Sequence, residues 1–400
     1  MPALNGSGGE RSYTLVVPTY NRPKELGRLL QFLARQGARF PVLVLDSSRD
    51  DVRAANRAAL GAAGVDARHH EFDPAIPPFE KFWCGTGLVE TEFASFCADD
   101  DLLLVASLDP ILAFLAGHPD CAVAHGWYFA FRLAAAFELT GVAYCGRSID
   151  DPHPLDRLYE LMRDYEALTY GVYRTVVLQR ILGRVQSVQT NMARELLGSA
   201  LAVVAGTAVR LPVLYHGRAM GPSLYVSDWH PVDYLISSPE RLFQEYSSYR
   251  DVVADFLVEC APAAGDRIQL LRTVDQIHWR YAADYFKPTV LDYVLTGVRA
   301  GTPRAEIMNG MWPFLLAPDR EESTVGRLVR RLAGPLRRAA ASLGDAVERR
   351  ALGGGSTEPE ASRRAGRVYH LHPAFRQPIA ANAELRRAIP SLLQTLDAYG

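Results

Sequence analysis

Residues 96–104 read Phe-Cys-Ala-Asp-Asp-Asp-Leu-Leu-Leu, so three consecutive carboxylates (Asp99–Asp101, the acid triplet) stand between two apolar runs. Two unit charges about 4 Å apart repel each other by roughly 4 kcal/mol at an effective dielectric constant of about 20. The triplet therefore needs a cation, a cage of hydrogen bonds or full hydration. One interpretation is a bound divalent ion, because carboxylate oxygens suit Mg²⁺ or Mn²⁺. The other is a solvated turn that caps the next helix, and the surrounding sequence has to decide between them.

Two β–α units open the chain and predict a parallel sheet. A β-branched strand at 13–17 is followed by a turn and by a helix from Lys24 whose leucines recur at helical spacing. A second buried strand at 41–45 ends at Asp46, and an alanine-rich helix at 52–60 follows. Because ligands bind beyond the carboxyl ends of such strands, we expect Asp46 and the acid triplet to share one edge of the sheet.

The segment between Asp46 and the triplet extends this alternation. Residues 67–72 predict a short edge strand, and the prolines of 73–78 predict a rigid loop. A helix carrying Lys81 follows, and the strand at 92–96 delivers the triplet. The predicted order is therefore strand and helix three times, then a strand and the acid cluster.

Three motifs in this order resemble a family 2 glycosyltransferase of the GT-A type. They are Val16-Val17-Pro18-Thr19-Tyr20-Asn21-Arg22, the strand-end Asp46, and Ala98-Asp99-Asp100-Asp101. The resemblance covers about residues 12–225, after a disordered N-terminus at 1–11. It implies an α/β fold of the GT-A kind, a Rossmann-like and mainly parallel sheet flanked by helices. It also implies inverting, metal-dependent transfer of a sugar from a nucleoside-diphosphate sugar to a hydroxyl acceptor.

The resemblance assigns roles to the donor side of the site. The turn after the first strand would lie along the nucleotide, Asp46 would bind the base, and the triplet would hold the ribose and the metal-bound diphosphate. Arg218, in a glycine-containing loop expected after Tyr215, suits phosphate because guanidinium binds oxyanions in bidentate fashion. The predicted donor contacts are Pro18, Thr19, Tyr20, Asn21, Arg22, Asp46, Lys81, Asp99, Asp100 and Arg218.

Metal ligands are expected within the triplet. If the backbone there is extended, Asp99 and Asp101 share a face and Asp100 points away. We predict Asp101 as the direct ligand of Mn²⁺ or Mg²⁺, with Asp99 beside it on the nucleoside side. His230 is a further candidate ligand, since some GT-A enzymes use a late histidine, although the pattern favours a solvated loop there.

The general base is expected further along the chain, on a helix. Residues 168–175 resemble the Tyr-Xaa-Val-Tyr-Arg-Thr segment of a bacterial subgroup of these enzymes, and Glu195 opens a helix shortly afterwards. The family keeps its base at this place, and such a base contributes about 10²–10⁴-fold to the rate. The alternative is an acid that only favours the helix dipole. The competing carboxylates are Asp156, Glu160, Asp164, Glu166 and Asp228.

The rest of the chain divides by composition. Residues 226–320 have helical periodicity and predict an extension on the acceptor side or a lid. Residues 321–366 predict a basic amphipathic helix and a glycine-rich linker, before a C-terminal segment at 367–400 in which Pro390 is expected to interrupt a helix at 383–396. The basic helix either touches an anionic membrane peripherally or packs on its own domain.

Composition excludes several classes of function. The 400 residues are 48% hydrophobic and 22% charged, with a formal net charge of −2, which gives no indication of a nucleic-acid partner. No apolar run reaches the roughly 18 residues that span a bilayer, so we predict a cytoplasmic protein, with membrane association left open. The five scattered cysteines predict reduced thiols.

Two other functions remain open at this point. One is a catalytically inactive GT-A-like module that binds a carbohydrate or a partner. The weaker one is a sugar nucleotidyltransferase, although such enzymes usually open with a glycine-rich loop, which Pro18-Thr19-Tyr20-Asn21 replaces here. The acceptor of the transferase would be a glycan, a lipid-linked glycan or a small molecule.

Overall fold

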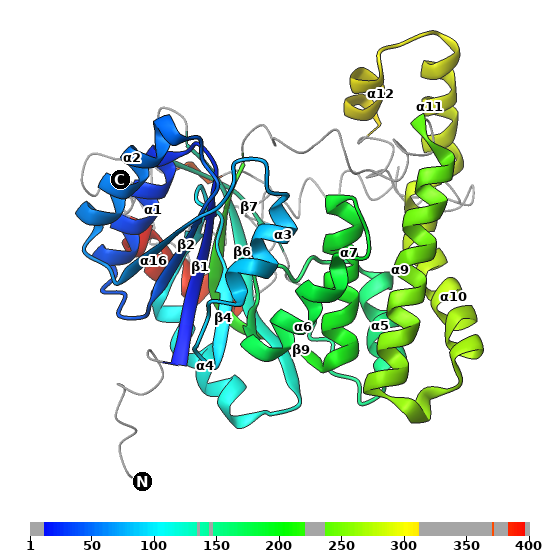
Figure 1. The fold of residues 1–400 in the computed structure, drawn as a ribbon, viewed down its shortest axis with the longest axis horizontal. Coiled ribbons are helices and arrows are strands. Elements are labelled where there is room, and N and C mark those ends of the chain that lie inside the picture. The colour runs from blue at the N-terminus through cyan, green and yellow to red at the C-terminus, as the bar shows by residue number, and fades with distance from the viewer. Residues whose placement is uncertain are drawn as a thin grey trace, which may run out of the picture.

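The computed structural model describes residues 12–133, 137–143, 147–220, 237–311, 370–371 and 383–396. A central mixed sheet carries helices on both faces, and further helices lie beyond one of these layers (Figure 1). The predicted α/β class, with a largely parallel sheet flanked by helices and a helical extension after it, is therefore confirmed.

The first half of the sheet is parallel and follows the order β4-β1-β2-β3. In register, Thr19 lies opposite Asp46 and Asp46 lies opposite Glu71. The carboxyl ends of these strands thus meet at one edge, as predicted. The strands are β1 (Tyr13–Thr19), β2 (Val42–Asp46), β3 (Ala67–Glu71) and β4 (Phe93–Phe96).

The second half of the sheet is mixed. Strand β8 is antiparallel to both β4 and β6, so β6 runs in the same direction as β4, and β9 pairs in parallel with β6. Strand β9 also pairs with the short β5, which follows the acid triplet directly. The strands are β5 (Leu102–Leu103), β6 (Cys121–Leu133), β7 (Phe137–Ala143), β8 (Val172–Arg174), β9 (Thr207–Ala219) and β10 (His370–Leu371).

Alternating side chains of β1 divide the core into two layers. Leu15 and Val17 pack against the leucines of α1 and α4 on one face, whereas Val16 packs with α5, α6 and α7 on the other. The helices of the first two thirds are α1 (Pro23–Arg35), α2 (Asp50–Ala63), α3 (Pro78–Thr86), α4 (Leu108–Gly117), α5 (Pro154–Arg163), α6 (Thr175–Val185) and α7 (Asn191–Ala205).

The helical extension shares the second of these layers. Tyr249, Val253 and Phe256 of α9 and Val274 of α10 belong to the same buried cluster as α7 and the sheet. The extension is therefore built onto the α/β domain through a common core. Its helices are α9 (Pro239–Cys260), α10 (Arg267–Tyr285), α11 (Pro288–Arg299) and α12 (Arg304–Gly310).

A C-terminal helix, α16 (Ala383–Leu396), returns to the sheet. Its Leu392 and Leu396 are buried with Phe32 and with residues of β5, β6 and β9. The helix is continuous across Pro390, so the predicted interruption is wrong. Tertiary burial of this face offsets the hydrogen bond that proline removes.

Several predicted segments fall outside the described residues, namely 1–11 and the basic helix and linker at 321–366. Within the described part of the chain, every helix is too short or too polar to cross a membrane.

Candidate functional site

The acid triplet lies in a turn between β4 and β5. The backbone N–H of Asp101 donates to the carbonyl oxygen of Ala98 at 3.1 Å. This hydrogen bond forms a turn in place of an extended segment. The condition under which Asp99 and Asp101 would share one face, an extended backbone, is therefore not met, because a turn does not keep the alternation of a strand. Asp99 instead shares a partner with Asp100, and Asp101 points toward β9.

Asp99 is held against the turn after β1. The hydroxyl of Thr19 donates to its Oδ2 at 2.7 Å, and Arg22 reaches its Oδ1 at 3.3 Å and the Oδ2 of Asp100 at 2.6 Å. Burial raises the pKa of Asp99 to about 6, although Thr19 and Arg22 act in the opposite direction. The turn and the triplet, far apart in sequence, thus form one polar cluster.

Asp101 is bound by strand β9. Its Oδ2 lies 3.0 Å from Nε2 of His216, and its Oδ1 accepts a hydrogen bond from the backbone N–H of Ala219 at 2.8 Å. Gly217 lets β9 pack closely against β6, since a Cβ there would lie 2.4 Å from the ring of Phe129. Both Asp101 and His216 are buried.

Tyr170 connects the triplet with the other half of the site. Its ring stacks on His216 at a centroid distance of 4.9 Å, and the guanidinium of Arg218 lies 5.7 Å from the centre of the same ring. Arg218 belongs to β9, which continues to Ala219, so the predicted loop after Tyr215 is wrong and the arginine is fixed by the sheet.

Glu195 lies on the first turns of α7, close to this group. Burial raises the pKa of Glu195, while the positive charge of Arg218 acts in the opposite direction. Burial raises the pKa of the Tyr170 hydroxyl, and the negative charges of Asp101 and Glu195 raise it further. The candidate base and the triplet are therefore joined through Tyr170 and Arg218.

A cavity of about 280 Å³ opens beside the triplet. Its lining comes from the turn after β1, the loop before α3, α3 itself and the triplet: Pro18, Thr19, Tyr20, Arg22, Ser47, Pro74, Ile76, Pro78, Lys81, Phe82, Ala98, Asp99 and Tyr170. Most of the predicted donor contacts thus share one hollow.

Lys81 of α3 lines this cavity. Its Nζ donates to the carbonyl oxygen of Thr19 at 3.1 Å and to the hydroxyl of Ser47 at 2.8 Å. Burial lowers the pKa of Lys81 to about 8, against the attraction of Asp99 and Asp46. The ammonium group therefore keeps most of its charge at neutral pH and loses it as pH rises through about 8.

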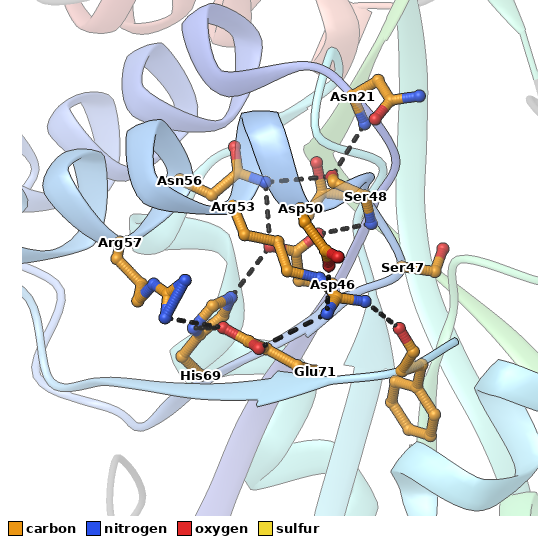
Figure 2. A network of polar contacts seen from close by, with 12 residues as sticks. Asn21, Asp46, Ser47, Ser48, Asp50, Arg53, Asn56, Arg57, His69 and Glu71 are labelled. Atoms are coloured by element: carbon orange, nitrogen blue, oxygen red, sulfur yellow. Dashed lines mark hydrogen bonds and ion pairs between the residues drawn. The ribbon is translucent and has the colours of Figure 1, made fainter. Parts of the chain in front are cut away.

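Asp46 does not line this cavity but is fully buried in a separate network of polar contacts (Figure 2). Its oxygens accept from the backbone of Ser48 at 2.8 Å and from Asn56 at 2.9 Å, and they lie 2.9 Å from Nε2 of His69. Burial opposes ionisation, but these hydrogen bonds outweigh it and lower the pKa of Asp46. The contact of Asp46 with the nucleotide base stays a prediction. It would require Ser48, Asn56 or His69 to release the carboxylate.

Asn21 shapes the turn instead of facing the cavity. It has a positive φ of 57°, which asparagine tolerates better than most residues. Its N–H donates to Ser48 at 2.8 Å and its side-chain oxygen accepts from the N–H of Arg49 at 3.0 Å. Figure 2 shows how this ties the turn after β1 to the loop after β2.

Three of the competing carboxylates lie elsewhere. Glu160, Asp164 and Glu166 line a separate cavity of about 310 Å³ with Arg163 and Arg210. Glu160 pairs with Arg163 at 2.7 Å, and Glu166 pairs with Arg210. Asp228 and the predicted metal ligand His230 lie outside the described residues.

The donor set suits a hard divalent ion. Among the residues that the structure describes, no group of three or more His, Cys, Asp or Glu side chains forms a preassembled cage. Mg²⁺ commonly binds through one or two carboxylates together with substrate phosphates and water, and does not require an all-protein cage. Asp99, which lines the cavity, therefore suits an ion that arrives with a phosphate-bearing ligand, whereas Asp101 would first have to exchange one of its two partners in β9.

Two residues of the site escaped sequence reasoning. The sequence pattern places His216 in the loop expected after Tyr215, and Tyr170 within a motif, and indicates no role for either. A signal is available for His216, because it stands two residues before the arginine assigned to phosphate, and a polar side chain that is buried there needs a hydrogen-bond partner.

No family model matches the chain. No curated protein matches it in sequence either. Among solved structures, the chain is similar to S. aureus TarS 1-349 in complex with UDP, at 17% identity and a TM-score of 0.46, over 71% of this chain and 75% of that one. The same protein in complex with UDP-GlcNAc gives 17% identity and a TM-score of 0.43, over 76% and 91%. The mannosyltransferase PcManGT from Pyrobaculum calidifontis, in complex with GDP-Man and Mn²⁺, gives 14% identity and a TM-score of 0.39, over 80% and 87%.

Proposed function

We propose that the protein is a glycosyltransferase of the GT-A type, related to family 2, which moves a sugar with inversion from a nucleoside-diphosphate sugar to a hydroxyl acceptor. The observation that carries this proposal is the meeting of the acid triplet, Lys81 and Glu195 around the carboxyl-end edge of the sheet. A cavity, a cluster of carboxylates and two cations at this edge match the needs of a diphosphate ligand and its metal.

The donor would occupy the cavity beside the triplet. Arg22 and Lys81 supply positive charge for the diphosphate, and the exposed ring of Tyr20 stands at the rim for the nucleoside. Thr19 orients Asp99 toward this space through its hydroxyl. Arg218 and Tyr170 close the side that faces the acceptor.

Asp101 and Asp99 would hold Mn²⁺ or Mg²⁺ together with the diphosphate. When bound, such an ion stabilises the negative charge that develops on the leaving nucleoside diphosphate. The role of the protein is to keep the two carboxylates oriented, through Thr19 for Asp99 and through His216 for Asp101.

Glu195 would take the proton of the acceptor hydroxyl. A new bond forms between the acceptor oxygen and the anomeric carbon, and the bond from that carbon to the diphosphate breaks. Partial burial favours this role because a raised pKa makes the carboxylate a stronger base. The positive charge of Arg218 acts in the opposite direction and favours the ionised form of Glu195.

A second candidate function is a catalytically inactive module that binds a sugar nucleotide. One observation favours it, namely that both oxygens of Asp101 already have partners within the protein. Metal binding would then require Asp101 to exchange one of these contacts.

The test is binding of UDP-, GDP-, CDP- and dTDP-sugars to the purified protein with and without Mn²⁺, for the wild type, Asp101→Ala and Glu195→Gln. We expect one donor to bind in a metal-dependent way that Asp101→Ala abolishes and Glu195→Gln preserves. Donor binding without turnover by the wild type would favour the inactive module. Absence of binding with every donor and metal would overturn the proposal.

A further inference from the structure

One arginine connects the turn after β1 to two carboxylates of the acid triplet. Nη1 of Arg22 lies 3.3 Å from Oδ1 of Asp99 and 2.6 Å from Oδ2 of Asp100. The side chain of Arg22 is 29% exposed and that of Asp99 is 5% exposed. Water and salt screen a partly buried pair less than a surface pair. The guanidinium group therefore neutralises part of the charge of the triplet within the protein itself.

The other oxygens of the triplet that face the protein have partners as well. The second oxygen of Asp99 accepts from Thr19, and both oxygens of Asp101 are bound by β9. Two cations close to the same carboxylate repel each other. A divalent ion that binds Asp99 must therefore displace Arg22 from this carboxylate or lose affinity through the repulsion.

Arg22 also lines the candidate donor cavity, together with Lys81. The two cations differ in their partners. Lys81 donates to a carbonyl oxygen and a hydroxyl group, which are uncharged, whereas Arg22 is paired with two carboxylates. Guanidinium binds phosphate oxygens in bidentate fashion too. Arg22 thus has two alternative sets of anionic partners, and it must leave the carboxylates to serve a phosphate.

This competition has a thermodynamic consequence. A diphosphate that binds alone and takes Arg22 leaves Asp99 and Asp100 without their counter-charge. A divalent ion that binds alone competes with Arg22 for the same carboxylates. When both bind, the ion replaces Arg22 at the carboxylates and Arg22 is free to pair with the diphosphate. Each ligand then removes a cost of binding the other, and such coupling is reciprocal.

We infer that Arg22 is an exchangeable counterion of the acid triplet, which pairs with Asp99 and Asp100 in the ligand-free protein and moves to the diphosphate when a divalent ion binds the carboxylates. The inference rests on the proposed function, which supplies the diphosphate and the ion. It gives Arg22 a role beyond supplying charge, because the exchange makes donor binding depend on the metal. No covalent bond changes in this step.

The first experiment titrates the full-length protein with Mn²⁺ alone, in the absence of nucleotide. We expect Arg22→Gln to bind Mn²⁺ about fivefold more tightly than the wild type, the effect of removing one partly exposed ion pair. Replacement of a residue that only supports the site would instead weaken the binding of Mn²⁺. Equal or weaker binding in Arg22→Gln would overturn the inference.

Two further variants are the controls. Lys24→Gln removes the same charge two residues further along, at an exposed position of α1, and should change the affinity for Mn²⁺ by less than about twofold. Arg22→Lys keeps the charge in the turn and should bind Mn²⁺ like the wild type. A gain in either control as large as that in Arg22→Gln would overturn the inference, because it would point to overall charge or to the shape of the turn.

The second experiment measures the coupling. UDP, GDP, CDP and dTDP are titrated with and without Mn²⁺, and the nucleotide that binds the wild type most tightly is carried forward. The factor by which Mn²⁺ improves its binding should be about fivefold smaller in Arg22→Gln than in the wild type. An equal factor in the two proteins would overturn the inference.

Failure of the proposed function would look different. If no nucleotide binds the wild type with any metal, while Arg22→Gln still binds Mn²⁺ more tightly, the donor site is refuted and the pairing of Arg22 with the triplet stands. If a nucleotide binds in a metal-dependent way and Arg22→Gln matches the wild type in both experiments, the donor site stands and the exchange by Arg22 is refuted.

Discussion

Nε2 of His216 lies 3.0 Å from Oδ2 of Asp101, and both side chains are almost completely buried. The strand that carries His216 also donates the N–H of Ala219 to the other oxygen of Asp101. A carboxylate held on both oxygens by one strand has a fixed direction. Asp101 therefore keeps one orientation although it lies in a turn and not in a strand.

The first prediction concerns His216→Ala. The change leaves a buried carboxylate oxygen without its partner, which costs about 1–3 kcal/mol of the free energy of unfolding. Metal-dependent donor binding should weaken as well, because Asp101 loses its orientation. Urea unfolding and donor titration measure the two effects. His70→Ala, at an exposed position on β3, serves as the control, and equal behaviour of the two variants would contradict the prediction.

The second prediction is a pH dependence of donor binding set by Lys81. Its pKa of about 8 means that the ammonium group loses its charge as pH rises through that value, whereas the diphosphate keeps its own charge. Donor affinity should therefore be fully developed below pH 8 and fall above it. Calorimetric titrations from pH 6.5 to 9.5 measure the change.

The control for this prediction is Lys81→Met. Loss of a charged hydrogen bond of about 1.5–3 kcal/mol should weaken donor binding by roughly ten- to a hundredfold at pH 7. The variant should also lose the alkaline decline. An unchanged decline in Lys81→Met would assign it to another group.

The third prediction concerns acid stability and Asp46. The hydrogen bonds from Ser48, Asn56 and His69 lower the pKa of Asp46 in the folded protein, whereas the unfolded chain titrates at about 3.9. Its contribution is thus complete above the unfolded pKa and is lost as pH falls through the lower folded pKa. Asp46→Asn should cost about 1–3 kcal/mol at pH 7.

The same variant should differ less from the wild type at pH 3 than at pH 7, as urea unfolding at the two values would show. Asp66→Asn, at an exposed position before β3, is the control and should have little effect at either pH. A constant difference between Asp46→Asn and the wild type across this range would show that the charge of Asp46 does not contribute.

The sequence predicted the sheet because its signals are local. Alternation of apolar strands with leucine-spaced helices fixed β1 to β4, and their shared carboxyl-end edge placed Thr19, Lys81 and the acid triplet together. The direction of Asp101 could not be read this way. It depends on pairing of β5 with β9, which joins residues more than a hundred positions apart.

The burial of individual polar side chains could not be predicted from the sequence either. Asp46 lies where the strand pattern predicts, but only the packing of Asn56 and His69 around it shows that its carboxylate is covered. The aromatic residues of α9 and α10 are a further example. They suit a core as well as a surface, and only the arrangement of the helices leaves Phe243 and Trp279 open to solvent.

The last prediction tests Glu195 as the base through its neighbour Arg218. The base acts as a carboxylate, so activity falls as pH drops below its pKa. The positive charge of Arg218 opposes the rise that burial causes in the pKa of Glu195. Arg218→Gln removes this opposition, so the pKa should rise further and the acid limb of the pH–rate profile should move to higher pH.

The matched control is Arg180→Gln, which removes a surface arginine that pairs with Glu259 on α9. Its acid limb should coincide with that of the wild type. Glu195→Gln should lower kcat by about 10²–10⁴-fold and retain donor binding. An acid limb that stays in place in Arg218→Gln, in a variant that still binds the donor, would mean that a group other than Glu195 takes the proton of the acceptor.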